Sequence, residues 1–279
     1  MRIAGFAAAL GVTFGAAALA GASLDPLRDA GSSHGHDAMG GARSVAGGPA
    51  GLGVSEGGYT LAPDASSIPL GRPADLRFRI LGPDGDAVTD FDVEHERRMH
   101  LIVVRRDLTG YQHLHPVLDA SGAWSVRLAL PEAGVYRAYA DFTTGGRSMT
   151  LATDLFAGGA FDPVPLPSPA PDDETADGYR AELASHGAAA GESAELEYAL
   201  SRDGRPLEDV EPYLGADGHL VALREGDLAF LHAHPEESDE PGVIRFEASL
   251  PSPGRYRLFL QFKHRGEVRT VAHTLEVPR

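Results

Sequence analysis

The chain has 279 residues, no cysteine and a formal net charge of -16 at pH 7. Without cysteine there are no thiolate metal sites, disulfide scaffolds or cysteine nucleophiles, so any metal must be held by nitrogen, oxygen or thioether ligands. The strong negative charge excludes nucleic acid as an expected partner and disfavours anionic membrane surfaces.

Residues 1–23 have the pattern of an export signal. A charged start, Met1-Arg2, precedes an apolar run rich in Ala and Gly, and two small-x-small cleavage sites lie between residues 18 and 22. The run is also about as long as a membrane span, so a retained anchor helix is the alternative. Both interpretations predict an extracytoplasmic protein that is either secreted or anchored to the membrane by this segment.

Residues 24–53 are too rich in Gly, Ala and Ser to bury a core, so they predict a flexible tether. The tether contains His34 and His36, followed closely by Met39. Imidazole and thioether together suit both oxidation states of copper, which makes these histidines additional candidate ligands. The alternative is that they have no function.

Two copies of one sequence pattern follow, at residues 54–158 and 176–279. Landmarks recur in the same order about 120 residues apart: Gly58-Tyr59 with Gly178-Tyr179, Asp84-Gly85 with Asp203-Gly204, and Gly134-x-Tyr136-Arg137 with Gly254-x-Tyr256-Arg257. Residues 159–175 between the copies are rich in proline, which cannot donate ladder hydrogen bonds, so they predict a linker. The sequence therefore predicts two tandem domains.

Each copy contains short runs in which apolar and polar residues alternate, such as 76–80, 124–128 and 243–246, separated by turn residues. Alternation with a period of two over five to seven residues is typical of half-buried β-strands. The Gly-x-Tyr-Arg element resembles the tyrosine corner of Greek-key sandwiches. We therefore expect an all-β chain with two tandem antiparallel immunoglobulin-like β-sandwich domains after the N-terminal signal or anchor helix.

The histidines share one spacing, used twice. His100 is followed by His113 and His115, and the second copy repeats this spacing as His219, His232 and His234. Each copy predicts a hairpin that closes its first histidine against an H-x-H strand end, where residues i and i+2 point to the same face. Two separate triads are therefore expected, each able to share one ion.

The first domain has two further candidate ligands, His95 and Met99, just before His100. The matching stretch of the second domain, residues 211–218, offers mainly acids. Histidines also pack in duplicated cores without binding metal, so the alternative to a metal site is a hydrogen-bonded cluster. His186, His264 and His273 have no partner by spacing and are expected to be structural or exposed.

These residues resemble a group of exported two-domain proteins of GC-rich bacteria labelled heavy-metal-binding. The resemblance rests on Glu94-His95-Glu96, on residues 100–108 and 113–116, and on residues 213–223, and it covers residues 54–279. The domains are also similar to immunoglobulin-like or cupredoxin-like copper-handling modules. The chain departs from the cytosolic heavy-metal-associated domain because it lacks the Cys-x-x-Cys of that domain.

Three function classes remain. The first is an extracytoplasmic protein that sequesters or delivers copper or zinc, with a membrane metal transporter or another cell-surface protein as its partner. The second is a tandem adhesion or scaffold protein with structural histidines. The third is a three-histidine zinc enzyme. G-x-S-x-G, H-E-x-x-H and Walker A patterns are absent, so the enzyme class is disfavoured and no catalytic residue is assigned.

Overall fold

The structure, a computed structural model, describes residues 49–279 apart from residue 176. The predicted signal or anchor helix and the tether histidines His34 and His36 lie outside the described residues. The described chain is built from strands and turns, as predicted. None of its segments is a helix of the length and apolarity needed to cross a membrane.

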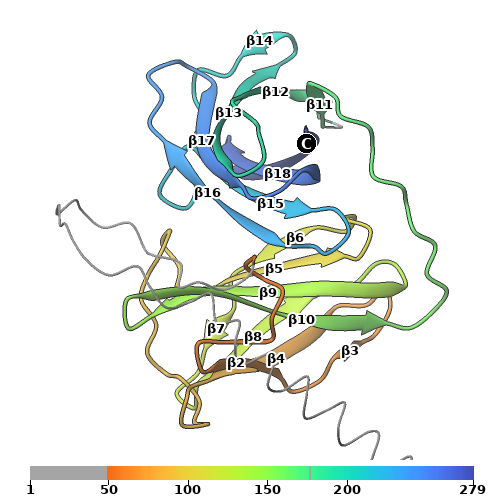
Figure 1. Cartoon of the computed structure of the whole chain (residues 1–279), viewed down its shortest axis with the longest axis vertical. Coiled ribbons are helices and arrows are strands. Elements are labelled where there is room, and N and C mark those ends of the chain that lie inside the picture. The colour runs from red at the N-terminus through yellow and green to blue at the C-terminus, as the bar shows by residue number, and fades with distance from the viewer. Residues whose placement is uncertain (1–48, 176) are drawn as a thin grey trace, which may run out of the picture. The chain divides into compact units, whose positions relative to one another are not determined.

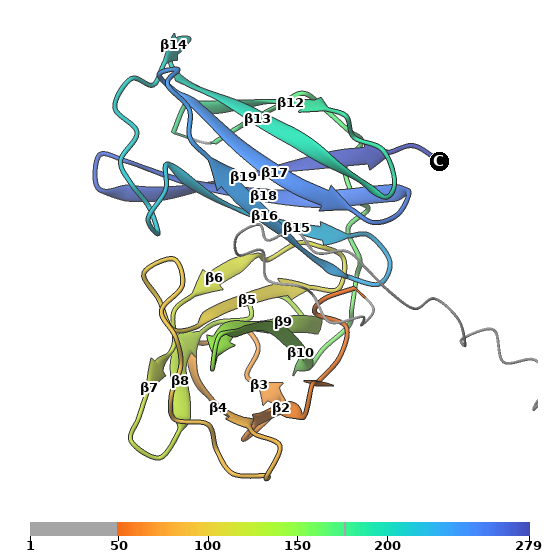
Figure 2. The same ribbon diagram turned by 60° about the vertical axis from the view of Figure 1, so that its left-hand side comes forward.

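The first repeat is a sandwich of two five-stranded sheets (Figures 1 and 2). One sheet has the order β1-β2-β4-β8-β7: Ser55–Glu56, Tyr59–Pro63, Ala74–Leu81, Ala123–Leu128 and Val117–Leu118. The other has the order β3-β10-β9-β5-β6: Ser67–Ile68, Arg147–Ala157, Gly134–Thr144, His100–Arg105 and Gln112–Leu114. Only the pairing of β3 with β10 is parallel among these described strands.

In the second repeat the two layers are joined into one nine-stranded sheet. Its order is β11-β12-β13-β17-β16-β15-β18-β19: Asp172–Glu174, Tyr179–His186, Glu192–Arg202, Val243–Leu250, Phe230–Glu236, Gly218–Arg224, Gly254–His264 and Glu267–Val277. The short β14, Arg205–Pro206, pairs with β13. Strand β16 pairs with β17 at one end and with β15 at the other, and so passes from one layer to the next.

The alternating runs form the core of each sandwich. In β4, Leu76, Phe78 and Ile80 are buried, whereas Arg77 between them is exposed. Phe78 lies against Trp124 of β8, with ring centroids 6.5 Å apart. Burial of each such side chain contributes on the order of 1.5–3 kcal/mol, so the alternation itself specifies the sandwich.

The Gly-x-Tyr-Arg elements form two matching tyrosine corners. Tyr136 donates its hydroxyl hydrogen to the carbonyl oxygen of Glu132 at 2.9 Å, and Tyr256 donates to Ser252 at 2.7 Å. Each hydroxyl is thus bound to the backbone four residues upstream, at the start of a long strand. The predicted immunoglobulin-like sandwich, present twice, is therefore confirmed.

A third apolar cluster joins the outer faces of the two sandwiches. Strand β5 alternates between two buried faces: Leu101 and Val103 belong to the core of its own sandwich, whereas Ile102 and Val104 contact the second repeat. The ring centroids of Tyr111 and Phe259 lie 4.1 Å apart in a stacked pair across the repeats. Tyr139 donates its hydroxyl to the carbonyl of Leu228 at 2.7 Å. The faces in contact are the ones that carry the histidine motif.

Two segments expected to be unpaired are held in place at their ends. Residues 172–174, assigned to the linker, form β11, and Ala50, assigned to the tether, forms a bridge with Phe230. Val164 of the linker donates its backbone N–H to Asp107 at 2.8 Å. Backbone groups can form hydrogen bonds without an apolar pattern in the sequence. The side-chain pattern alone therefore predicts a tether and a linker that are longer than the unpaired segments.

Candidate metal centre

Three histidines from the two repeats lie together. His100 begins β5, His113 lies in β6, and His219 lies near the start of β15. One ring nitrogen from each can be chosen so that all three lie within 4.8 Å of one another. Among the described residues, this is the one group of three histidine, aspartate or glutamate side chains whose ligand atoms lie within that distance of one another.

The hairpin register explains how the first two histidines meet. Leu101 pairs with Leu114 and Ile102 with His113, so His100 is level with His115 while His113 stands two pairs further along, on the same face. The second repeat has the same register, because Val221 pairs with His232. The predicted hairpins are therefore present in both repeats.

The triad expected in the first repeat is present, with the ring centroids of His100, His113 and His115 lying 4.8–5.2 Å apart, and a histidine of the second repeat joins it. The outer faces of the two sandwiches pack against each other, so His219 contacts the histidines of the first repeat. Its ring centroid lies 4.7 Å from that of His113 and 5.7 Å from that of His100. A prediction made on each hairpin separately could not include this packing between repeats.

His95 and His115 surround the group. The ring centroid of His115 lies 4.8 Å from that of His113 and 5.2 Å from that of His100. Its Nε2 atom is buried and has no hydrogen-bond partner. The exposed ring of His95 lies about 6 Å from two others, with centroid distances of 6.1 Å to His100 and 6.0 Å to His219.

The remaining predicted ligands lie elsewhere. The side chain of Met99 is buried in the core of the first sandwich, where it faces the apolar cluster. His234 is exposed on β16, in register with Glu247. For His232 only the backbone position belongs to the described part of the chain. Of the predicted ligands with described side chains, the structure therefore brings together His100, His113 and His219, with His95 and His115 beside them.

His100 and His113 each direct one ring nitrogen at an oxygen acceptor and the other at the neighbouring ring. His100 donates from Nε2 to the carbonyl of Glu94 at 3.1 Å, and His113 donates from Nδ1 to Oε1 of Gln261 at 2.7 Å. His100 Nδ1 and His113 Nε2 then face each other at 3.0 Å, each with a lone pair. A neutral imidazole has one N–H, so with the Gln261 oxygen turned towards His113 the contact is completed by a third proton or a metal ion. With the amide turned by 180°, a hydrogen bond between the two neutral rings completes it.

Burial makes the third proton unfavourable. Desolvation, reinforced by the neighbouring His100, lowers the pKa of His113 to about 3 and that of His115 to about 4. Desolvation also lowers the pKa of His100 and holds that of His219 well below the usual range. The four rings are thus neutral near pH 7, which is the form that binds metal.

Two outer partners of the group were missed by sequence reasoning, Asp141 and Gln261. Asp141 is the register partner of His100, and Gln261 is that of His219. Thr150 donates to Asp141 at 2.8 Å, and Gln261 donates from Nε2 to Thr270 at 3.3 Å, which leaves its oxygen facing His113. A signal existed, because the two polar residues occupy matching positions of the repeat, 120 residues apart.

The turn that carries His95 adopts an unusual conformation. Residues 94 and 97 exchange two backbone hydrogen bonds, and the two central residues have positive φ, 47° at His95 and 63° at Glu96. Such a turn favours Asn-Gly, and each side chain in the left-handed region costs on the order of 1–2 kcal/mol. The corresponding turn of the second repeat has Leu214-Gly215, where glycine relieves one of the two positions.

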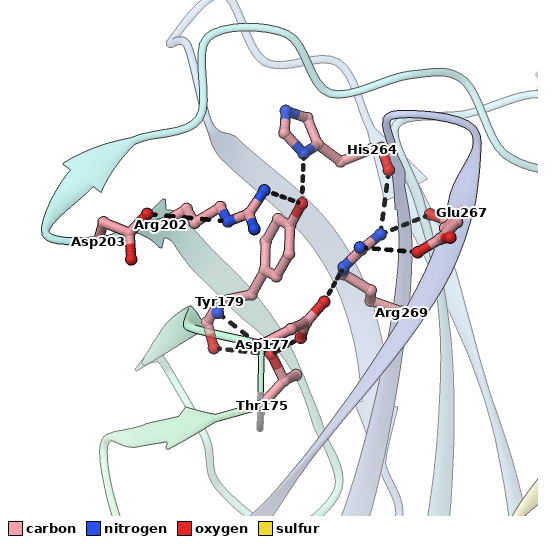
Figure 3. Close-up of polar contacts among 8 residues, drawn as sticks. All are labelled: Thr175, Asp177, Tyr179, Arg202, Asp203, His264, Glu267 and Arg269. Carbon is pink, nitrogen blue, oxygen red and sulfur yellow. Dashed lines mark hydrogen bonds and ion pairs between the residues drawn. The ribbon is translucent and has the colours of Figure 1, made fainter.

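The histidines without partners by spacing have structural roles or are exposed. His264 accepts a hydrogen bond at Nδ1 from Tyr179 at 2.7 Å and donates from Nε2 to Asp209 at 2.9 Å. The Tyr179 ring lies between Arg202 and Arg269 (Figure 3). His273 donates to the carbonyl of Ala181 at 3.2 Å, and His186 is exposed.

Solved structures with similar folds share little sequence with the chain. A DUF4426 family protein from Pseudomonas aeruginosa PAO1 is 9% identical with a TM-score of 0.31, and the match covers 38% of this chain and 94% of that one. The Escherichia coli adhesin FdeC is 11% identical with a TM-score of 0.27 (81% of this chain, 65% of that one). InvD of Yersinia pseudotuberculosis is 11% identical with a TM-score of 0.25 (80% and 58%). At these scores the similarities carry no functional argument.

No curated protein matches the chain. One family matches it twice, at residues 54–158 and 174–279, which are the two sandwich repeats. That family is described as a domain of unknown function, DUF8832, and the heavy-metal label of the resemblance finds no support in it. The two matches together span most of the sequence, and the chain therefore belongs to the DUF8832 family.

Proposed function

We propose that this protein binds one copper or zinc ion between its two repeats, at His100, His113 and His219. The observation that carries the proposal is the convergence of three ring nitrogens within 4.8 Å of one another. Two of them, on His100 and His113, lie 3.0 Å apart, and the second nitrogen of each ring contacts an amide oxygen. Metal-binding histidines characteristically donate their second N–H to such an acceptor, which sets the tautomer and the ring orientation.

The donor set suits copper or zinc. Both ions accept neutral imidazole, with Zn–N bonds of about 2.0–2.1 Å, so nitrogens in a tetrahedral site are about 3.3–3.4 Å apart. The 3.0 Å between His100 and His113 needs an opening of only a few tenths of an ångström. His115 lies beside the group, but its ring nitrogens are not among those that lie within 4.8 Å of one another, so three imidazoles make up the donor set.

We propose binding rather than catalysis because the G-x-S-x-G, H-E-x-x-H and Walker A patterns do not accompany the three histidines. Three imidazole donors leave a fourth coordination position for water or for an exposed ligand. We infer an extracytoplasmic protein, secreted or anchored by residues 1–23, that sequesters the ion or delivers it to a membrane transporter or another cell-surface protein. Asp141 beside His100 adds negative charge that favours a cation.

Equilibrium dialysis of the chain without residues 1–23 tests this proposal. At pH 7 we expect one equivalent of Cu(II) or Zn(II) per chain, because the two repeats share one site. The matched control is His186→Ala. It removes an exposed histidine that does not belong to the group of three, so the stoichiometry should stay at one. Retention of no ion by the wild-type chain would favour the adhesion or scaffold alternative, in which the histidines are structural.

A further inference from the structure

We propose, on the basis of the function proposed above, that His95 is the solvent-side ligand through which the metal ion enters and leaves the site. The inner ligands are poorly accessible: residue His100 is 3% exposed, and His113 and His219 are only partly exposed. His95 is the exposed imidazole next to this group, with its ring about 6 Å from those of His100 and His219.

The backbone that carries His95 is fixed to an inner ligand. Residue 94 forms both hydrogen bonds of the turn, and its carbonyl oxygen also accepts the N–H of His100. The turn therefore holds the exposed ring at a set position relative to His100. His95 can then contact a hydrated ion first and pass it to the inner rings.

The comparison between repeats indicates that the turn belongs to the fold and that its side chain at position 95 is particular to the first repeat. The second repeat makes the same turn with Leu214-Gly215, between the bridged residues Tyr213 and Ala216. The first repeat instead has His95-Glu96, both with positive φ and without glycine. Left-handed φ occurs at Leu214 as at His95, so the first repeat differs by placing an imidazole there, about 6 Å from the rings of His100 and His219.

The ligand class follows from the chemistry of the exposed ring. A hydrated divalent ion exchanges one water for the His95 imidazole and then exchanges further waters for the buried rings. Release reverses these steps, with a chelating donor outside the protein capturing the ion from His95. The ion keeps its charge throughout, so no oxidant or reductant is needed.

The test is a stopped-flow measurement of Zn(II) uptake, and of release to EDTA, by wild type, His95→Asn and Glu96→Gly. Asparagine tolerates positive φ but is a poor ligand for zinc, so we expect both rates to fall at least about tenfold while one ion per chain still binds. Glu96→Gly keeps His95 and relaxes the turn, so its rates should match those of the wild type.

The outcomes separate the two proposals. Unchanged uptake and release in His95→Asn, with one ion bound, would overturn the role of His95 and leave the site intact. Complete loss of binding in His95→Asn would show an essential inner ligand and would also overturn the proposed role. A wild-type chain that binds no Zn(II) or Cu(II) in the preceding dialysis would remove both proposals.

Discussion

Replacement of His219 by alanine is expected to weaken metal binding by at least about 100-fold. Loss of a group that only supports a ligand costs up to about 100-fold, and loss of a ligand should cost no less. His219 belongs to the second repeat, whereas His100 and His113 belong to the first. The large effect is expected because these rings form one group, with ligand atoms within 4.8 Å. Isothermal titration of the intact chain with Zn(II) or Cu(II) gives the affinity.

The matched control is His234→Ala. His234 belongs to the same repeated motif and the same repeat as His219, but its side chain is exposed and lies outside the group of three. Its replacement should leave affinity and stoichiometry unchanged. Equal losses in both variants, or a loss in His234→Ala alone, would contradict a shared site and would support a separate triad in the second repeat.

Acidification is expected to destabilise the ion-free protein strongly between pH 6.5 and about 4. The pKa of His113 is about 3 and that of His115 about 4 in the folded state, against about 6.5 in the unfolded state. As the pH falls below 6.5, the unfolded chain therefore binds protons that the folded cluster excludes. The contribution to stability is complete above pH 6.5 and is lost towards the folded-state pKa values. Urea unfolding of the ion-free chain across this range measures it.

His113→Gln provides the control for this titration, because carboxylates of an acidic chain also protonate below pH 5. Glutamine keeps a polar side chain without a titrating ring, so the slope of unfolding free energy against pH above pH 5 should be smaller in this variant. Bound metal should oppose the acid effect, with about 2.7 kcal/mol of stabilisation at 100 times the dissociation constant. Parallel pH profiles for wild type and His113→Gln would contradict the buried, neutral state of His113.

The local features of the fold could be predicted from the sequence. Alternation in 76–80 marked a strand with one face in the core, and the spacing of Tyr136 and Tyr256 marked the corners. The hairpin of β5 and β6 was also predictable, because its register depends on residues close in sequence. Each of these features is set by side chains within one repeat.

The contact between repeats could not be predicted from either hairpin alone. One signal was present: residues 101–104 are continuously apolar, as are 220–223, and such runs are typical of strands buried on both faces. Met99 could have been excluded by parity, because neighbours along an extended chain point to opposite sides and His100 occupies the outer face. The role of Gln261 required the three-dimensional pairing with His113.

The most direct test of the account is a crystal structure of the chain soaked with Zn(II), with anomalous data collected at the metal edge. We expect one anomalous peak per chain, bounded by the ring nitrogens of His100, His113 and His219. Two peaks, one in each repeat's own histidine motif, would contradict the shared site. No peak at these three rings would contradict metal binding there.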